Sequence, residues 1–220
     1  MDEGQKWRDL RNSYDVVAEE YARRIYDELK DKPLDRQLLD RFAREAQPPI
    51  CDIGTGPGHV ARYLHDRGAN SSGLDISAGM VQQARRLNPG IEFQQGNMLA
   101  LDAANGSWGG ITAFYSIIHV PRVEVINALR EFKRVLCPSG LLLIAFHVGD
   151  ETRHLEDWWD NAVSIDFNFF TPQEMQSYLM NAGLEVIEVI QREPYPDVEH
   201  QSQRCYIFAR KPGNPSEFVG

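Results

Sequence analysis

Glycine stands at every second position in a short segment that follows an apolar run near residue 50. The segment reads C-D-I-G-T-G-P-G over residues 51–58. Glycine adopts positive φ angles at little steric cost and lets a ligand approach the backbone closely. A helix that begins just beyond the segment would add free backbone amides. The segment therefore predicts a turn that binds a nucleotide-like ligand.

The spacing of these glycines, and an acidic residue in front of them, narrow the choice of ligand. Dinucleotide-binding folds use G-x-G-x-x-G, but the position three residues after Gly56 is His59. This difference counts against a nicotinamide oxidoreductase. Asp52 stands two residues before the first glycine, and its carboxylate would repel a pyrophosphate but attract an ammonium group. We therefore favour a cationic ligand over a phosphate.

A second carboxylate, that of Asp75, follows the glycines by roughly 20 residues, at the end of an expected strand. A carboxylate at this position can accept hydrogen bonds from both hydroxyls of a ribose. The alternative is an aspartate that only ends the strand beside Ser77, a residue typical of helix N-caps. Because the glycines lie upstream, we favour the ribose-binding function.

The elements that must position these residues alternate along the chain from residue 50 onward. Apolar runs predict strands over 50–53, 71–76, 91–94, 110–117 and 141–147. Helical patterns fall between them, over 59–66, 77–86 and 121–136. Such alternation predicts an α/β fold with a mostly parallel sheet and helices on both faces.

The two ends of the chain depart from this alternation. Residues 171–174 (T-P-Q-E) predict the start of a helix that Gly183 ends. Strands expected over 184–190 and 204–210 have no helix between them, so they should pair as an antiparallel hairpin. The segment up to residue 42 is helical in pattern. Because it precedes the first strand, we expect it to pack as a lid or flank.

Composition and charge argue against several classes of protein. The chain has 220 residues, 42% of them hydrophobic, and a formal net charge of −9. This acidic balance is untypical of nucleic-acid-binding proteins, so we expect no nucleic-acid partner. The longest apolar run, 141–148, is far shorter than the roughly 20 residues of a membrane span. The N-terminus lacks a signal-peptide pattern, and three widely spaced cysteines fit reduced thiols. We therefore expect a cytoplasmic protein with no membrane partner.

Taken together, these motifs resemble the class I S-adenosylmethionine-dependent methyltransferases of the small-molecule type. After D-I-G-T-G-P-G, the matching segments are G-L-D-I-S-A-G-M, Q-G-N-M, A-F-Y-S-I-I-H and R-V-L-C-P-S-G-L-L-L-I-A. They stand in the family's order over residues 50–145. The resemblance implies S-adenosylmethionine as the cofactor and methyl transfer to a small molecule as the activity. It also implies a Rossmann-like, doubly wound sheet that ends in an antiparallel C-terminal hairpin, with an N-terminal helical lid.

The resemblance further implies which residues contact the cofactor. In the family, the glycine loop lines the methionine part, the acid before the loop lies near the amino group, and the acid after the second strand holds the ribose. The corresponding positions here are Gly54, Thr55, Gly56 and Gly58, then Asp52, then Asp75. The adenine would be contacted by Ile76 and Met80, and by Asn97 and Met98 where the family usually has an acidic residue. Ser116 would lie beside the transferred methyl, and Tyr14 and Tyr21 would close over the cofactor or only pack their helix on the sheet.

Two histidines are candidates for the base that takes a proton from a hydroxyl or amine acceptor. His119 follows the fourth strand and His147 ends the fifth, at the edge of the sheet where ligands bind in such folds. The alternatives are structural histidines, or transfer by proximity with no base. His147, Glu151 and His154 could be imagined as a metal site, but they straddle an expected loop and we expect no metal.

These expectations divide the chain into the parts of one methyltransferase domain, 1–220. The parts are a lid (1–46), a cofactor-binding core (47–147), an aromatic-rich, substrate-shaping insertion (148–170), and a C-terminal helix and hairpin (171–212). A noncatalytic protein that binds S-adenosylmethionine or S-adenosylhomocysteine is the alternative function. The Asn-Pro-Pro-aromatic motif of enzymes that methylate bases or amides is absent after Phe114. We expect a monomer or a weak homodimer.

Overall fold

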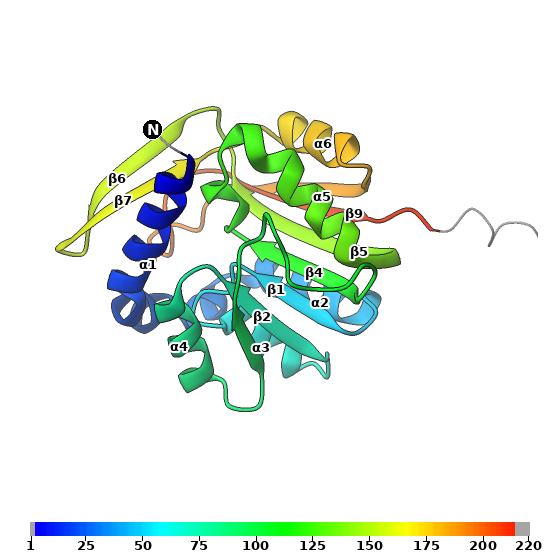
Figure 1. Cartoon of the computed structure of the whole chain (residues 1–220), viewed down its shortest axis with the longest axis horizontal. Helices are drawn as coiled ribbons and strands as arrows, with labels where there is room; N and C mark the ends of the chain where they lie inside the picture. The colour runs from blue at the N-terminus through cyan, green and yellow to red at the C-terminus, as the bar shows by residue number, and fades with distance from the viewer. Residues whose placement is uncertain (1–2, 214–220) are drawn as a thin grey trace, which may run out of the picture.

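The computed structural model describes residues 3–213 and is organised around a seven-stranded sheet (Figure 1). Its strands, in spatial order, are β3 (Glu92–Gln95), β2 (Ser71–Asp75), β1 (Ile50–Ile53), β4 (Trp108–Phe114), β5 (Leu136–His147), β9 (Arg204–Arg210) and β8 (Glu185–Arg192). The first five are parallel, whereas β9 runs antiparallel to both β5 and β8. The expected Rossmann-like sheet with an antiparallel C-terminal hairpin is confirmed. Residues 1–2 and 214–220, which the expected domain includes, lie outside the described part.

Helices cover both faces of the sheet because its central strands are apolar on both sides. In β5, Leu142, Ile144 and Phe146 pack toward α5 (Val125–Val135) and α6 (Pro172–Asn181). The alternating residues Leu143 and Ala145 pack toward α2 (Pro33–Glu45) and α3 (His59–His65). Successive side chains of a strand point to opposite faces, so one strand serves two layers. Helix α4 (Ala78–Leu87) lies on the same face as α3, and the two share an apolar cluster with β3.

The helix caps expected from the sequence are present. The Ser77 hydroxyl accepts a hydrogen bond from the Met80 amide at 3.0 Å, and so begins α4. Thr171 accepts one from the Glu174 amide at 3.2 Å, with Pro172 in the first turn of α6. These bonds satisfy amides that have no partner within their own helix.

The N-terminal segment is two helices rather than one. Helix α1 covers Glu3–Ile25, a 3₁₀ turn covers Glu28–Asp31, and α2 begins at Pro33. Pro33 explains the interruption immediately before α2, since it disfavours helical backbone angles at Lys32, whose φ and ψ are −118° and 77°. Helix α1 crosses the C-terminal edge of the sheet, packed against α4 and β7 (Figure 1). The expected lid position is therefore the one observed.

The aromatic-rich insertion forms a β-hairpin where the sequence suggested a loop. Strands β6 (Thr152–Trp158) and β7 (Asn161–Asn168) pair antiparallel and lie beside α1 (Figure 1). Trp159 and Asp160 form the turn with φ angles of 54° and 62°. Such turns usually carry Asn-Gly or Asp-Gly, so Trp-Asp gives no recognisable signal. Val163 and Ile165 are buried in a cluster with α1, which makes the hairpin the outer support of the lid.

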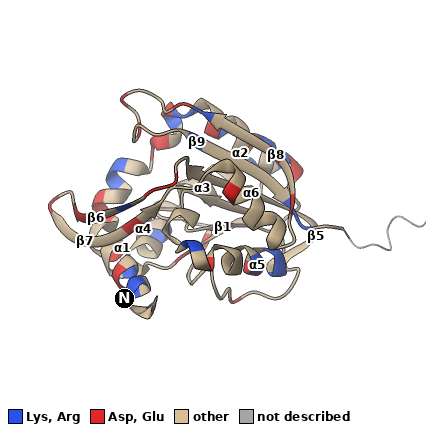
Figure 2. Cartoon of the chain, turned by 90° about the horizontal axis from the view of Figure 1, so that it is seen from above, with Lys and Arg blue, Asp and Glu red and all other residues tan. Residues whose placement is uncertain are grey.

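The surface charges of the described residues are mixed rather than segregated. Acidic and basic residues alternate along α1, whereas the hairpin β6–β7 carries mainly acidic residues (Figure 2). Cys51, Cys137 and Cys205 are unpaired thiols. Within residues 3–213, no helix is both long and apolar enough to cross a membrane.

Candidate active site

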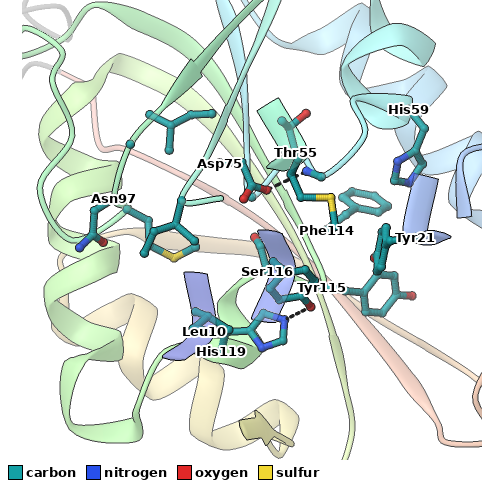
Figure 3. Close-up of a pocket in the computed structure, with 18 of the residues that line it drawn as sticks. Leu10, Tyr21, Thr55, His59, Asp75, Asn97, Phe114, Tyr115, Ser116 and His119 are labelled. Atoms are coloured by element: carbon teal, nitrogen blue, oxygen red, sulfur yellow. Dashed lines mark hydrogen bonds between the residues drawn. The ribbon is translucent and has the colours of Figure 1, made fainter. Parts of the chain in front are cut away.

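The candidate site lies where the order of the strands reverses. The chain leaves β1 in one direction and β4 in the other, and such a switch point opens a crevice at the carboxyl ends of the strands. A cavity occupies this position, and we call it the cofactor cavity (Figure 3). Twelve residues singled out from the sequence line it, namely Tyr14, Tyr21, Gly54, Thr55, Gly56, Asp75, Ile76, Met80, Asn97, Met98, Ser116 and His119.

The glycine loop has a backbone that requires glycine. Gly54 and Gly56 have φ angles of 71° and 53°, in the left-handed region that side chains disfavour. A Cβ on Gly54 would lie 2.2 Å from the Cβ of Ser116, which is far inside van der Waals contact. The loop and the segment after β4 therefore approach each other as closely as the backbone allows, and the floor of the cavity is bare backbone.

Asp75 tethers the loop and still has capacity to accept further hydrogen bonds. Its two carboxylate oxygens accept from the Gly56 amide at 2.8 Å and from the Ser77 amide at 2.9 Å. Each oxygen has a second lone pair, so two hydroxyl donors can still be accommodated. Burial raises the pKa of Asp75 to about 6, against the hydrogen bonds from the two amides. Holding the loop and the Ser77 amide is thus compatible with ligand binding by this side chain.

Asp52 and Gly58, also singled out from the sequence, do not line the cofactor cavity. Asp52 is buried behind the loop, where its carboxylate accepts a hydrogen bond from the Thr112 hydroxyl at 2.7 Å. Burial raises the pKa of this carboxyl. Gly58 is the N-cap of α3, and its φ is 84°. A Cβ there would lie 2.7 Å from the Phe93 ring. Both residues support the loop from behind.

The far end of the cavity is suited to a flat apolar group. Ile76 and Met80 line it together with Asn97 and Met98. The Asn97 side-chain oxygen accepts a hydrogen bond from the Leu99 amide at 2.9 Å, so this side chain is already held in a turn. Asn97 lies at the opposite end of the cavity from His59, and Asp75 and Thr55 lie between them (Figure 3).

Two tyrosines of α1 close the cavity from above. The Tyr21 ring lies 3.7 Å from the position that a Cβ on Gly56 would take, so it covers the glycine loop. The rings of Tyr14 and Tyr21 meet edge to face, with centroids 5.9 Å apart. Burial raises the pKa of Tyr14 well above its usual range, which keeps the phenol protonated. The lid and the cavity therefore share the same side chains.

His119 is held in one tautomer by two hydrogen bonds. Its Nδ1 lies 3.1 Å from the Asp166 carbonyl oxygen, which can only accept, so Nδ1 carries the proton. Nε2 consequently accepts a hydrogen bond from the Tyr14 hydroxyl at 2.8 Å. Burial lowers the pKa of His119 to about 4, so the ring is neutral at physiological pH.

A second cavity of about 500 Å³ adjoins the first. Five residues line both, namely Tyr14, Tyr21, Glu28, Tyr115 and His119. The hairpin β6–β7 contributes the aromatic side chains of Trp158 and Phe167 to the wall of the second cavity. The cavity is also lined by the cations Lys32, Arg153 and Arg204 and by the acids Glu28 and Glu199. The shared residues form the boundary between the two cavities.

The structure separates the two histidines proposed as bases. His147 lines the second cavity but not the first. Its ring stacks on Phe169, with centroids 5.0 Å apart and an interplanar angle of 19°, and its Nδ1 lies 2.9 Å from the Ser202 hydroxyl. Burial, followed by the charge of Arg204, lowers the pKa of His147 to about 3. Of the two histidines, His119 alone stands at the boundary between the cavities.

Several lining residues carried no recognisable signal in the sequence. Glu28 lies in the 3₁₀ turn after α1, and His59 is the first residue of α3. Tyr115 follows β4 with a φ of 51°, a strained value for a non-glycine residue and one that recurs at functional sites. Only the three-dimensional arrangement brings these three side chains to the glycine loop.

Comparisons with known proteins agree with this geometry. Residues 50–140 match a family model described as a methyltransferase domain. A malonyl-[acyl-carrier protein] O-methyltransferase of Enterobacter lignolyticus is 29% identical over 119 residues, which are 54% of this chain and 45% of that protein. A demethylmenaquinone methyltransferase of Chlorobaculum parvum is 30% identical over 144 residues, covering 61% of this chain and 58% of that protein. The chain spans about half the length of these curated relatives.

Solved structures share the fold. A methyltransferase from Methanosarcina mazei superposes with a TM-score of 0.70 at 19% identity, covering 79% of this chain and 98% of that one. The magnesium protoporphyrin IX methyltransferase of Synechocystis, solved with bound S-adenosylmethionine, has a TM-score of 0.69 at 17% identity and covers 94% of this chain and 97% of that one. The sheet order and the glycine loop agree with the matched family model, so residues 50–140 are identified as a methyltransferase domain, within a chain that has the fold of the class I S-adenosylmethionine-dependent methyltransferases.

Proposed function

We propose that this protein transfers a methyl group from S-adenosylmethionine to a small-molecule acceptor held in the second cavity. The observation that carries the proposal is the boundary of five residues shared by the two cavities. A methyl group can pass between two ligands only if their reacting atoms meet within roughly 3–3.5 Å. Relatives named for malonyl-[acyl-carrier protein], demethylmenaquinone and magnesium protoporphyrin IX support an acceptor other than a nucleic acid. The formal net charge of −9 supports the same choice.

The residues of the cofactor cavity fit S-adenosylmethionine. Asp75 retains lone pairs for two ribose hydroxyls, and Ile76 and Met80 would cover the adenine. The bare backbone of Gly54 and Gly56 leaves room for the methionine part. When bound, the cofactor supplies an electrophilic methyl group on a positively charged sulfur. The protein has to align the acceptor with this methyl group and exclude water, which the aromatic lid suits.

His119 acts on the acceptor through Tyr14 in this proposal. Its only unprotonated nitrogen already accepts the Tyr14 hydroxyl, so an acceptor O–H or N–H would donate to the Tyr14 oxygen. As the acceptor loses its proton to this oxygen, the phenol proton moves to Nε2, and the Asp166 carbonyl continues to hold Nδ1–H. A histidine with a pKa near 4 is a weak base. It suffices for a hydroxyl acceptor, because the oxygen becomes strongly acidic as it gains a methyl group.

His147 has a different role in the proposal. Because it stacks on Phe169 and lines only the second cavity, it would contact the body of the acceptor rather than the reacting atom. The aromatic side chains Trp158 and Phe167 would pack on the same molecule, which favours an acceptor with a flat or apolar part.

Methyl transfer can be tested before the acceptor is known. The purified protein is incubated with methyl-labelled S-adenosylmethionine and a protein-free metabolite extract, and labelled small molecules are separated and counted. We expect label in one or a few compounds, and none with the Asp75→Ala variant. If the protein binds S-adenosylhomocysteine but labels nothing across extracts, the alternative of a noncatalytic cofactor-binding protein is favoured.

A further inference from the structure

The carboxylate of Glu28 lies at the end of the cofactor cavity for which the sequence suggested Asp52. Glu28 and His59 line the cavity together, with Glu28 Oε1 3.1 Å from His59 Nε2. The second oxygen of Glu28 accepts a hydrogen bond from Lys32 Nζ at 2.6 Å. This pair thus joins the turn after α1 to the first residue after the glycine loop.

The long axis of the cavity indicates which part of the cofactor meets this pair. Asn97 and His59 lie at opposite ends, with Asp75 and Thr55 between them (Figure 3). If Asp75 binds the ribose and Ile76 and Met80 cover the adenine, the remaining part of the cofactor extends over the loop toward His59. That part is an amino acid, and its α-amino group is a positively charged donor of three hydrogen bonds.

The acceptors needed for an ammonium group are present at this end. Although burial opposes ionisation, the hydrogen bond from His59 and the charge of Lys32 lower the pKa of Glu28 to about 2, so it is a carboxylate at neutral pH. In its neutral form His59 donates Nε2–H to that carboxylate and presents Nδ1 as an acceptor. Nδ1 is buried without a hydrogen-bond partner in the described structure. A buried acceptor without a donor is costly, and a ligand N–H would remove that cost.

Asp52 does not meet the same need. It lies behind the loop, bonded to Thr112, and does not line the cavity. Among the described residues that line the cofactor cavity, the carboxylates are those of Asp75 and Glu28. Since the ribose uses Asp75, Glu28 is the acid available to the amino group.

We propose that Glu28 and His59 bind the α-ammonium group of the methionine part of the cofactor, the role that the sequence suggested for Asp52. The inference rests on the proposed function, because it presupposes S-adenosylmethionine in this cavity. It gives the N-terminal segment a part in binding as well as in covering. Glu28 belongs to the turn that connects α1 to α2, so the ammonium group would link that turn to the glycine loop.

Three ligands separate this contact from the rest of the cofactor site. They are S-adenosylhomocysteine, its analogue in which hydrogen replaces the amino group, and 5′-methylthioadenosine, which lacks the amino acid part altogether. Isothermal titration of the wild-type protein should show S-adenosylhomocysteine binding about 10- to 100-fold more tightly than the desamino analogue. Glu28→Gln should reduce this preference to less than about threefold, while its affinity for 5′-methylthioadenosine stays within about threefold of wild type.

Each result bears on a different claim. His59→Leu should reduce the same preference in part, and the matched control Glu19→Gln, at an exposed glutamate of α1, should leave it unchanged. The comparison is made between ligands within one variant, so a loss of stability in Glu28→Gln does not mimic the result. Retention of the wild-type preference in Glu28→Gln would overturn the inference while leaving the cofactor site intact. Failure of all three ligands to bind the wild-type protein would instead overturn the cofactor assignment itself.

Discussion

The hydroxyl of Tyr14 lies 2.8 Å from Nε2 of His119, and this hydrogen bond joins the lid helix to the segment that follows β4. It stands at the boundary between the two cavities, where an acceptor and a methyl donor would meet. The lid therefore has a polar contact with the floor of the site in addition to its aromatic packing. In the proposed reaction, closing the lid also completes the route by which a proton leaves the acceptor.

Removing the Tyr14 hydroxyl should affect turnover more than cofactor binding. Tyr14→Phe keeps the ring that packs on Tyr21 but cannot relay a proton to His119. We expect turnover to fall by about 10- to 100-fold and the affinity for S-adenosylhomocysteine to change by less than about threefold. Rates with saturating labelled cofactor and titration of each variant give the two quantities. His119→Asn should show the same pattern. Wild-type turnover in both variants would show that the Tyr14–His119 hydrogen bond only holds the lid helix in place and takes no part in proton transfer.

The affinity for the cofactor should fall as the pH is lowered through 6. Burial raises the pKa of Asp75 from its ordinary value to about 6, and only the ionised carboxylate can accept from both ribose hydroxyls while holding the Gly56 and Ser77 amides. Affinity is therefore full above pH 6 and is lost below it. Titrations with S-adenosylhomocysteine between pH 5 and pH 8 measure the slope. In Asp75→Asn the affinity should be lower by roughly 10- to 100-fold and nearly independent of pH. If the affinity of this variant depends on pH as strongly as that of the wild type, a group other than Asp75 is responsible for the pH dependence.

Because Gly54 lies so close to Ser116, we expect that position 54 cannot accept any side chain, even that of alanine. Gly54→Ala adds a Cβ where the Ser116 Cβ would be 2.2 Å away, at a φ of 71°. We expect it to lower the free energy of unfolding by about 3 kcal/mol and to abolish measurable cofactor binding. Gly68→Ala is the matched control, since its φ is 83° but nothing lies within 4 Å of the added atom. It should cost about 1 kcal/mol and leave binding intact. Equal effects in the two variants would contradict the steric explanation.

Acid should destabilise the protein partly through His147. Burial lowers the pKa of its ring to about 3, below the ordinary value, so an unfolded chain binds this proton more readily than the folded one. Its contribution to stability is present above the ordinary pKa of about 6.5 and is lost as the pH falls toward 3. His147→Phe retains a ring that can stack on Phe169 but does not titrate. The free energy of unfolding, measured with denaturant at pH 7 and pH 5, should fall less between the two pH values in the variant than in the wild type. An equal fall in both would show that a group other than His147 takes up the destabilising proton.

The parts of the site that follow from local rules were predictable from the sequence. The turn over residues 54–58 needs glycine at fixed positions, and an N-cap needs a residue such as Ser77, so both are visible in a single chain. The mostly parallel sheet and the antiparallel terminal hairpin follow from the order of strands and helices along the chain, whereas the doubly wound arrangement was implied by the family resemblance. These rules bring Asp75 to the glycine loop without reference to any distant residue.

What the sequence did not reveal depends on contacts between distant segments. Glu28 reaches the loop from the 3₁₀ turn between α1 and α2, a break in the N-terminal helical segment that the helical pattern did not show. The turn at Trp159 and Asp160 has no typical turn residues, and the hairpin it closes is held by packing against α1, which local patterns do not reveal. Asp52 belongs to a recognisable motif, but its burial behind the loop depends on Thr112 of the neighbouring strand.

The most direct test of the cofactor site is isothermal titration of the purified, folded protein with S-adenosylhomocysteine, the product common to every methyl transfer from this cofactor. We predict binding at a single site in the micromolar range, abolished in Gly54→Ala and retained in Gly68→Ala. No binding by a wild-type protein that unfolds cooperatively would contradict the cofactor assignment, because the glycine loop would then be a structural turn rather than a cofactor site.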